Sequence, residues 1–213
     1  MTAWADFFPY IQPLVPSCPN PSVEHAVRAA CIEFCDQTHF LTDTMDQITF
    51  VAGENTYEVD VPTGYVLSQP VVLFANGLQL VRKAPHELEQ LFGRLDWQEV
   101  TGTTPCYFTM FNTYEIVLAP TPDATGVVTG RIAYTPSRTA TEVDDQVFES
   151  YAEVIADGAL AQIYMHPDQP YTSATLALAH RSKFDAGIAN AKATVRGGMS
   201  AATPMQVRFR RHW

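Results

Sequence analysis

Three residues of the sequence could together bind a metal ion: Cys31, Cys35 and His39. Their spacing places the three side chains on one face of a helix, and two thiols with one imidazole form a ligand set that suits Zn2+. No fourth ligand stands at a recognisable spacing, and two cysteines four residues apart on an apolar helix are typical of a core. We therefore interpret the cysteines as reduced core residues and expect neither a metal nor another cofactor.

Other residues with catalytic potential have structural interpretations. Asp144 and Asp145 could be paired acids or a cation site, but directly before a helix such carboxylates cap the N-terminus and favour its dipole. His166 lies in an expected turn and His180 on a helix face, and neither has a nucleophile in a known elbow pattern. Gly197-Gly198 follows a helix rather than a strand, unlike a phosphate-binding loop. These patterns do not indicate an enzyme.

The C-terminal end of the chain offers a different chemistry, that of protein binding. Residues 181–213 contain seven Lys and Arg against one acidic residue, although the whole chain has a net charge of -10. Arginine and large aromatic side chains are favoured anchors of protein interfaces. We expect partner binding through Met205, Val207, Arg208, Phe209, Arg210, Arg211 and Trp213. The alternation in residues 207–210 would also permit strand addition to a sheet edge.

Composition limits the remaining classes of function. Hydrophobic residues make up 46% of the chain and charged residues 17%, so a sizeable folded core is expected. The acidic balance argues against a general nucleic-acid binder, because affinity for phosphates comes mainly from Lys and Arg. No apolar run is long enough to cross a bilayer and the first residues lack the basic region of a signal peptide, which predicts synthesis in the cytoplasm and no membrane partner.

The N-terminal part of the chain should consist of an arm followed by a helix. Residues 1–21 contain five prolines, which predict an extended segment without a helix. Trp4, Phe7 and other apolar residues make this arm suited to lie on its own domain or on a neighbouring subunit. After Ser22, a candidate N-cap, apolar residues recur at helical spacing and predict a helix over about residues 22–40.

The middle of the chain has the alternation and turn residues of short strands. Asn76-Gly77 is the strongest turn signal, because a type I′ hairpin needs positive φ at both central positions. A short helix or loop is expected at residues 84–93. Strand pairs are expected at 48–51 with 56–61, at 71–75 with 78–81 and at 107–111 with 115–119, and a further strand at 127–134. These strands indicate an antiparallel β-sandwich or barrel-like domain.

Helical spacing returns in the last third of the chain. One helix should begin at Asp144 or Asp145 and end before Pro167, and another should begin after Thr172 or Ser173 and end near Gly197-Gly198. The predicted fold class is α+β, with a helical bundle of one N-terminal and two C-terminal helices and an inserted antiparallel β domain. The predicted domains are an extended arm at 1–21, bundle segments at 22–45 and 137–197, a β domain at 46–136 and an extended docking tail at 198–213.

Six motifs follow one another along the chain in a characteristic order. They are IQPLVPSCP at 11–19, VEHAVRAACIEFC at 23–35, YEVDVP at 57–62, FANGL at 74–78, LAPTP at 118–122 and YAEVIADGALA at 151–161. Taken in this order, they resemble the head-to-tail adaptor (connector) proteins of tailed bacteriophages. The likeness is greatest to the tail tubular protein A type of short-tailed phages, and it covers residues from about 7 to 195.

The resemblance implies a structural protein of the virion without enzymatic activity. It implies a dodecameric ring of this chain beneath the portal protein, with the C-terminal tail docked on the portal and a distal tail or nozzle protein beyond. DNA would pass through the central channel without specific binding, during ejection as well. An acidic body suits such a conduit, because a basic channel would bind phosphates and arrest transit. Assembly in the host cytoplasm and a final location at the head–tail junction follow.

Two other classes of function remain open at this point. The β insertion could be a binding module that attaches tail fibres or glycans, which exposed aromatic side chains at Trp97, Tyr107 or Phe108 would favour. A zinc-dependent hydrolase would rest only on the two cysteines and the histidine named first.

Overall fold

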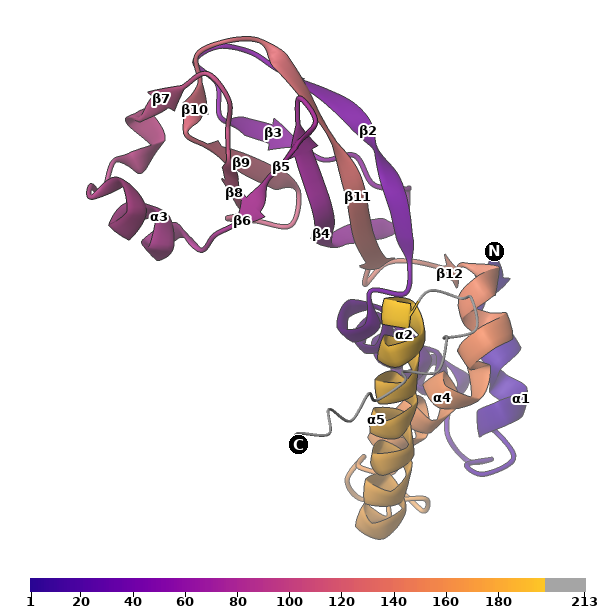
Figure 1. Ribbon diagram of the computed structural model, residues 1–213. Coiled ribbons are helices and arrows are strands. Elements are labelled where there is room, and N and C mark those ends of the chain that lie inside the picture. The colour runs from indigo at the N-terminus through magenta and orange to yellow at the C-terminus, as the bar shows by residue number, and fades with distance from the viewer. Residues whose placement is uncertain (198–213) are drawn as a thin grey trace, which may run out of the picture.

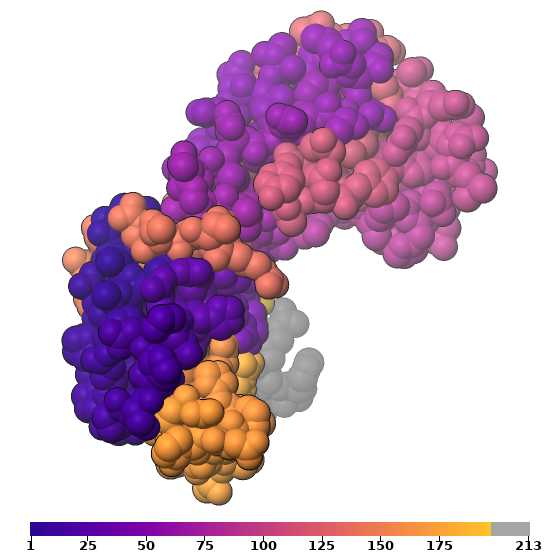
Figure 2. Space-filling view, turned by 180° about the vertical axis from the view of Figure 1, so that it is seen from behind, coloured from indigo at the N-terminus to yellow at the C-terminus, as the bar shows by residue number. Residues whose placement is uncertain are grey.

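The computed structural model describes residues 1–197, which form an α+β structure with five α-helices and mostly antiparallel sheets. Helices α1, α2, α4 and α5 gather in one lobe, and the long strands and α3 form a second lobe (Figure 1). The space-filling view shows the two lobes joined by a narrower connection (Figure 2). The helices are α1 Phe8–Ile11, α2 Asn20–Thr38, α3 Pro85–Phe92, α4 Asp145–Ile163 and α5 Ala174–Gly197, with 3-10 helices η1 Trp4–Phe7 and η2 Trp97–Glu99.

The three long helices lie where the sequence predicts them, but the expected N-cap of α2 is wrong. Ser22 lies inside the helix, whose N-cap is Pro19 without a side-chain hydrogen bond, because the helix already begins at Asn20. Helix α2 carries a proline in its first turn, where no backbone donor is needed, and ends at His39, which has the left-handed φ of 51°. Asp144 is the N-cap of α4 and accepts a 2.8 Å hydrogen bond from the Gln146 amide. The Ser173 hydroxyl accepts a bond from the Leu176 amide at the start of α5. The expected helices are therefore confirmed, with bounds shifted by a few residues.

The N-terminal arm differs from the expectation of an extended segment. Residues 4–11 form η1 and α1, because Pro9 lies in the first turn of α1 and removes no hydrogen bond there. The side chains of Trp4, Phe7 and Ile11 are buried in the same cluster as the long helices. The segment thus packs on its own chain, and most of its large apolar residues are in the core, although Tyr10 and Leu14 are exposed.

Helices α2, α4 and α5 approach one another closely at two glycines. A Cβ atom on Gly158 of α4 would lie 2.8 Å from Phe184 of α5 and 2.9 Å from the Cβ of Ala30 of α2. A Cβ atom on Gly187 would lie 2.5 Å from Val154. Since real Cβ atoms do not approach neighbours so closely, both positions need glycine for the helices to keep this distance.

The β lobe contains two four-stranded sheets. In the first sheet the order of neighbouring strands is β2 Thr42–Phe50, β11 Gly126–Pro136, β4 Tyr65–Ala75 and β5 Leu78–Gln79. In the second sheet the order is β3 Thr56–Glu58, β9 Glu115–Ala119, β8 Tyr107–Thr109 and β6 Val81–Arg82. Two short pairs complete the set, β1 Thr2–Ala3 with β12 Glu142–Val143 and β7 Thr101–Gly102 with β10 Thr121–Pro122. The pairs β6–β8 and β7–β10 are parallel, unlike the expected antiparallel pattern. Buried side chains of both large sheets form one hydrophobic cluster.

Two of the expected hairpins are confirmed and one is wrong. Strands β4 and β5 pair across Asn76 and Gly77, whose φ angles are 48° and 83°, and β8 pairs with β9. Residues 48–51 and 56–61 do not pair, because β2 belongs to the first sheet and β3 to the second. At this crossing Gly53 donates to the Pro122 carbonyl and Val51 to the Tyr57 hydroxyl. The loop-or-helix segment at 84–93 contains helix α3.

The predicted domain boundaries stay a prediction, although the burial pattern is compatible with them. One hydrophobic cluster lies among the long helices and another between the two large sheets. Strand β2 begins at Thr42, a few residues before the predicted start of the β domain at 46.

Replacing Asn76-Gly77 by Val-Val should lower the free energy of unfolding by roughly 2–4 kcal/mol, because β-branched residues are strained at positive φ. The change also removes the Asn76 side-chain oxygen that accepts a 2.9 Å bond from the Val127 amide. Chemical denaturation measures the loss, with Gln79→Val at an exposed position of β5 as the control. Unchanged stability would refute the assigned turn.

Candidate interaction surfaces

The residues expected to bind a partner lie outside the described residues. They are Met205, Val207, Arg208, Phe209, Arg210, Arg211 and Trp213, and the structure describes the chain up to Gly197. Their role stays a prediction, and the described residues show what surrounds the point where α5 ends.

Two basic residues of segment 181–213, in which basic residues outnumber acidic ones, bind other side chains of the helical lobe. Arg181 of α5 donates two hydrogen bonds to the Glu33 carboxylate of α2, at 3.1 and 2.6 Å, and lies 3.0 Å from Asp185. The hydrogen bond to Glu33 is the main reason that the pKa of Arg181 is raised. Lys192 donates to the side-chain oxygen of Gln37 at 3.2 Å. These residues link α5 to α2, whereas Lys183 and Arg196 of the same helix are exposed. The arginines beyond Gly197 stay the predicted contacts of an outside partner.

The three possible metal ligands are not arranged as a metal site. Cys31 and Cys35 are buried in the helical core, and a hydrogen bond between these two thiols, together with burial, raises the pKa of Cys31. A protonated thiol is a poor zinc ligand, since zinc binds thiolates. His39 instead lies 2.9 Å from the side-chain nitrogen of Gln69 on β4, and burial lowers its pKa. Within residues 1–197, no group of three His, Cys, Asp or Glu side chains could hold a metal ion.

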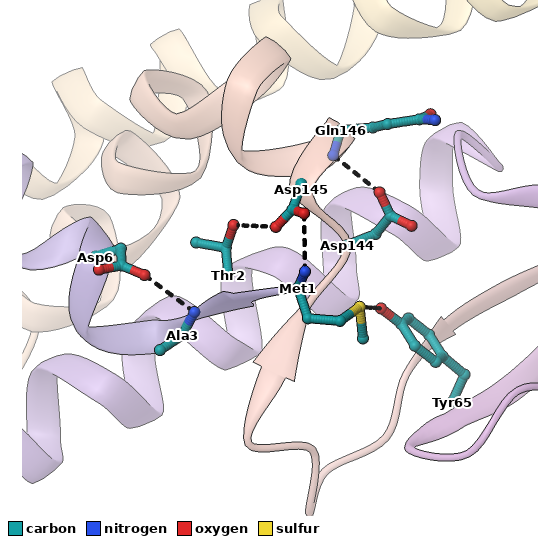
Figure 3. A network of polar contacts seen from close by, with 8 residues as sticks. All are labelled: Met1, Thr2, Ala3, Asp6, Tyr65, Asp144, Asp145 and Gln146. Carbon is teal, nitrogen blue, oxygen red and sulfur yellow. Dashed lines mark hydrogen bonds and ion pairs between the residues drawn. The ribbon is translucent and has the colours of Figure 1, made fainter.

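The two adjacent carboxylates at the start of α4 act as structural groups (Figure 3). Asp144 caps the helix, as expected. Asp145 accepts hydrogen bonds from the Met1 amino group at 2.8 Å and from the Thr2 hydroxyl at 2.7 Å. These two donors hold the pKa of Asp145 below its ordinary value, and the bond to Asp145 raises the pKa of the amino group. Asp145 therefore links the first strand to α4, whereas Asp144 caps the helix.

The two histidines considered for catalysis occupy separate places. His180 of α5 lies 2.6 Å from the Asp157 carboxylate of α4, and its ring stacks on Tyr164 with 5.5 Å between centroids. His166 lies in the loop after α4, near Tyr171. The His180–Asp157 pair is half-buried between two helices, where it adds a polar link to their packing.

The aromatic residues proposed for a binding face are mostly in the core. Trp97 and Phe108 are only 3% and 2% exposed, and Tyr107 is half-buried. The exposed apolar side chains nearby are Leu95, 78% exposed, and Phe111, 58% exposed, which line a hollow between α3 and the β8–β9 loop. Phe111 stacks on the buried Trp97, with 6.4 Å between ring centroids. In the sequence this patch has only a weak signal, an apolar residue between Arg94 and Asp96.

None of the helices in residues 1–197 is both long and apolar enough to span a bilayer.

Comparison with known protein families identifies the class of the protein as a phage adaptor, a structural component of the virion. The matching model is that of the SU10 adaptor protein, and it covers residues 16–208, so the chain belongs to the SU10 adaptor protein family. The match confirms the expectation of a bacteriophage head–tail adaptor. It does not reach the narrower likeness to tail tubular protein A, which stays a prediction. No curated protein matches the chain.

The burial of the cysteines predicts which thiols react in the native protein. Of the four, Cys106 is exposed, whereas Cys18, Cys31 and Cys35 are buried. Native protein should show one thiol that reacts quickly with Ellman's reagent, and the other three should react only after unfolding, because the reagent needs an accessible thiolate. Cys106→Ser should abolish the fast phase. Two or more fast thiols in the native protein would contradict the core assignment.

Proposed function

We propose that this protein forms a dodecameric ring between the portal and the tail of a tailed phage and provides a channel for DNA. The observation that carries the proposal is the family match, which covers residues 16–208 and so includes the whole described fold from α2 onward. The same match extends beyond Gly197 into the basic segment. The protein would be assembled in the host cytoplasm and act at the head–tail junction of the virion.

In this proposal the helical lobe is a bundle and the β lobe is an inserted sandwich. The shared hydrophobic cluster of the two large sheets supports the sandwich, and the packing of α2, α4 and α5 around Gly158 supports the bundle. Heterologous contacts between neighbouring copies close into a ring when the rotation between them fits. Each lobe would then face a neighbour or one end of the ring.

The basic tail is the proposed anchor on the portal protein. Arg208, Phe209, Arg210, Arg211 and Trp213 would insert into a groove of the portal, with Met205 and Val207 leading into it. One such anchor is weak, but several anchors on one ring act at high effective concentration. A distal tail or nozzle protein would contact the opposite end of the ring.

The acidic body is the proposed reason that DNA passes without sticking. The chain carries 23 acidic residues against 13 Lys and Arg, and part of that basic charge lies beyond Gly197. Arg181, within α5, is paired with Glu33. A channel wall with few unpaired cations does not neutralise phosphates, so it gives little affinity for the genome.

A second candidate function is attachment of tail fibres through the β lobe. The exposed Leu95 and Phe111 favour it, because adjacent apolar side chains on a surface are typical of protein contacts. Glycan recognition is less well supported, since Trp97 and Phe108 are buried rather than available for stacking on a sugar.

Electron microscopy of the purified protein mixed with the portal protein of the same phage tests the ring. We expect image classes with about twelve copies of this chain beneath the portal, the number that the resemblance to phage connectors implies, because heterologous contacts close into a ring when the rotation between copies fits. A protein that stays monomeric at every concentration and never binds the portal would refute the proposal. A ring without portal binding would refute only the docking.

Deletion of residues 199–213 tests the anchor separately. We expect the circular dichroism spectrum and the melting temperature to stay nearly unchanged, because residues 1–197 already supply two extensive buried clusters. Binding to the portal, measured by co-sedimentation, should be lost. A variant with the tail residues in scrambled order keeps the net charge of the tail, so it separates sequence-specific docking from non-specific electrostatic attraction. Loss of folding in the deletion would show instead that the tail is a core element.

A further inference from the structure

Strand β2 leaves one long edge of the first sheet open. It pairs with β11 on one side, and among residues 1–197 no strand pairs with its other side. Figure 1 shows β2 at the margin of the β lobe, with β11 beside it. The strand has nine residues, whereas β5 at the opposite margin has two. A long open edge of this kind is a template for another strand, and proteins usually shorten or cover it.

The hydrogen-bonding groups on this edge follow from the register with β11. Tyr134 donates to the Leu41 carbonyl, and Ile132 faces Asp43, so residues 41 and 43 bond toward β11. The amides of Thr42 and Thr44 therefore point away from β11, and the Thr44 amide is bound by the Asp43 carboxylate at 2.7 Å.

The far end of the strand has one further outward amide, that of Thr49. Its neighbour on β11 is Val127, whose carbonyl accepts a bond from the Asn76 amide on the other side of β11. Because Val127 bonds toward β4, it does not bond to Thr49, and the backbone groups of Thr49 point to the open edge.

The end of α5 lies close to the start of this edge. Thr194 and Val195 of α5 line one hollow together with Phe40, Leu41 and Thr42, where β2 begins. After Gly197, residues 198–204 can span about 23 Å when extended, at about 3.3 Å per residue. The segment 205–210 can therefore lie along β2 of the same chain.

The charges of the strand and the tail are complementary. Asp43 and Asp46 are exposed on β2, and Asp60 lines the same hollow as these two carboxylates. Residues 42–50 contain no lysine or arginine. In an extended segment 205–210, Arg208 and Arg210 would lie on one face and Val207 and Phe209 on the other. The long arginine side chains can reach carboxylates along the edge.

We propose that residues 205–210 pair as an added strand with the open edge of β2 in the same chain before the tail meets its partner. Backbone hydrogen bonds would supply the affinity and the Asp43 and Asp46 carboxylates the preference for an arginine-bearing strand. The pairing itself does not depend on the proposed function. With that function, it has the consequence that the portal and β2 compete for the same tail.

Disulfide trapping in the full chain tests the pairing. In a Cys106→Ser background, Val207→Cys is combined in turn with Thr42→Cys, Thr44→Cys and Thr49→Cys. Three positions along β2 are used so that one of the pairs matches the register between β2 and the tail. We expect one of these pairs to form an intramolecular disulfide under mild oxidation, seen as a faster monomer band on a non-reducing gel. The matched control is Val207→Cys with Gln79→Cys on the opposite margin, which should not cross-link. A disulfide-linked dimer would mean that a second copy is the occupant, and no cross-link at any position would mean that the edge is not used; either result overturns the proposal.

Hydrogen exchange provides a readout that does not depend on register. Deleting residues 199–213 should accelerate exchange of the outward amides of Thr42 and Thr49 by at least roughly tenfold, because they lose their partner strand. The amide of Leu73, within β4, should not change. Equal exchange of Thr42 and Thr49 in both proteins would overturn the pairing.

A charge variant separates this proposal from portal docking. Asp43→Asn with Asp46→Asn should reduce the cross-linking yield several-fold and leave binding to the portal intact or stronger, because the tail is then released from β2. Failure of portal binding with normal cross-linking would refute the proposed function alone. Unchanged cross-linking in this variant would refute the electrostatic basis of the pairing.

Discussion

The distance between the three long helices is the constraint on which the rest of the structure depends. At Gly158 the backbone of α4 lies against both Ala30 of α2 and Phe184 of α5, and no side chain fits between them. The chain enters the β lobe directly after α2 and returns from it just before α4. The positions of those two helices therefore fix where β2 and β11 leave the helical lobe. At the end of α2, Asp36 and His39 contact Ser68 and Gln69 of β4, so the helix end also supports the sheet.

The same packing determines how the uneven charge of the chain is used. Because α5 lies against α2, Arg181 reaches Glu33 and forms a two-bond pair across the helices. The basic residues of segment 181–213 thus fall into two groups. Arg181 and Lys192 link α5 to α2, and the arginines beyond Gly197 follow the end of α5, which shares a hollow with the start of β2. The net charge alone could not reveal this division, because it depends on which residues the fold brings together.

Features that depend on a few neighbouring residues could be predicted from the sequence. The Asn76-Gly77 turn and the Asp144 cap are of this kind, since one or two residues set the backbone angles or supply the acceptor. The wrong predictions of the arm and of the first hairpin concern distant contacts. Residues 4–11 form short helices because Trp4, Phe7 and Ile11 are buried against α2 and α4, and β2 and β3 separate because each pairs with a strand more than 50 residues away. The composition of the tail indicated a partner, whereas the exposure of Leu95 and Phe111 and the open edge of β2 exist only in the folded chain.

An adaptor that assembles in order must keep a binding segment available and yet unused until its partner arrives. An exposed apolar and basic tail would attract wrong partners, and a nine-residue open strand would pair with other chains. Pairing the tail with β2 within one chain would remove both risks, and a short linker gives an effective concentration on the order of millimolar. On the proposed function, a single portal contact would compete poorly with that concentration, whereas a closed ring would present many tails to one portal at once. Under that proposal, release from β2 would become favourable when several tails dock together, which would couple exposure of the anchor to completion of the ring.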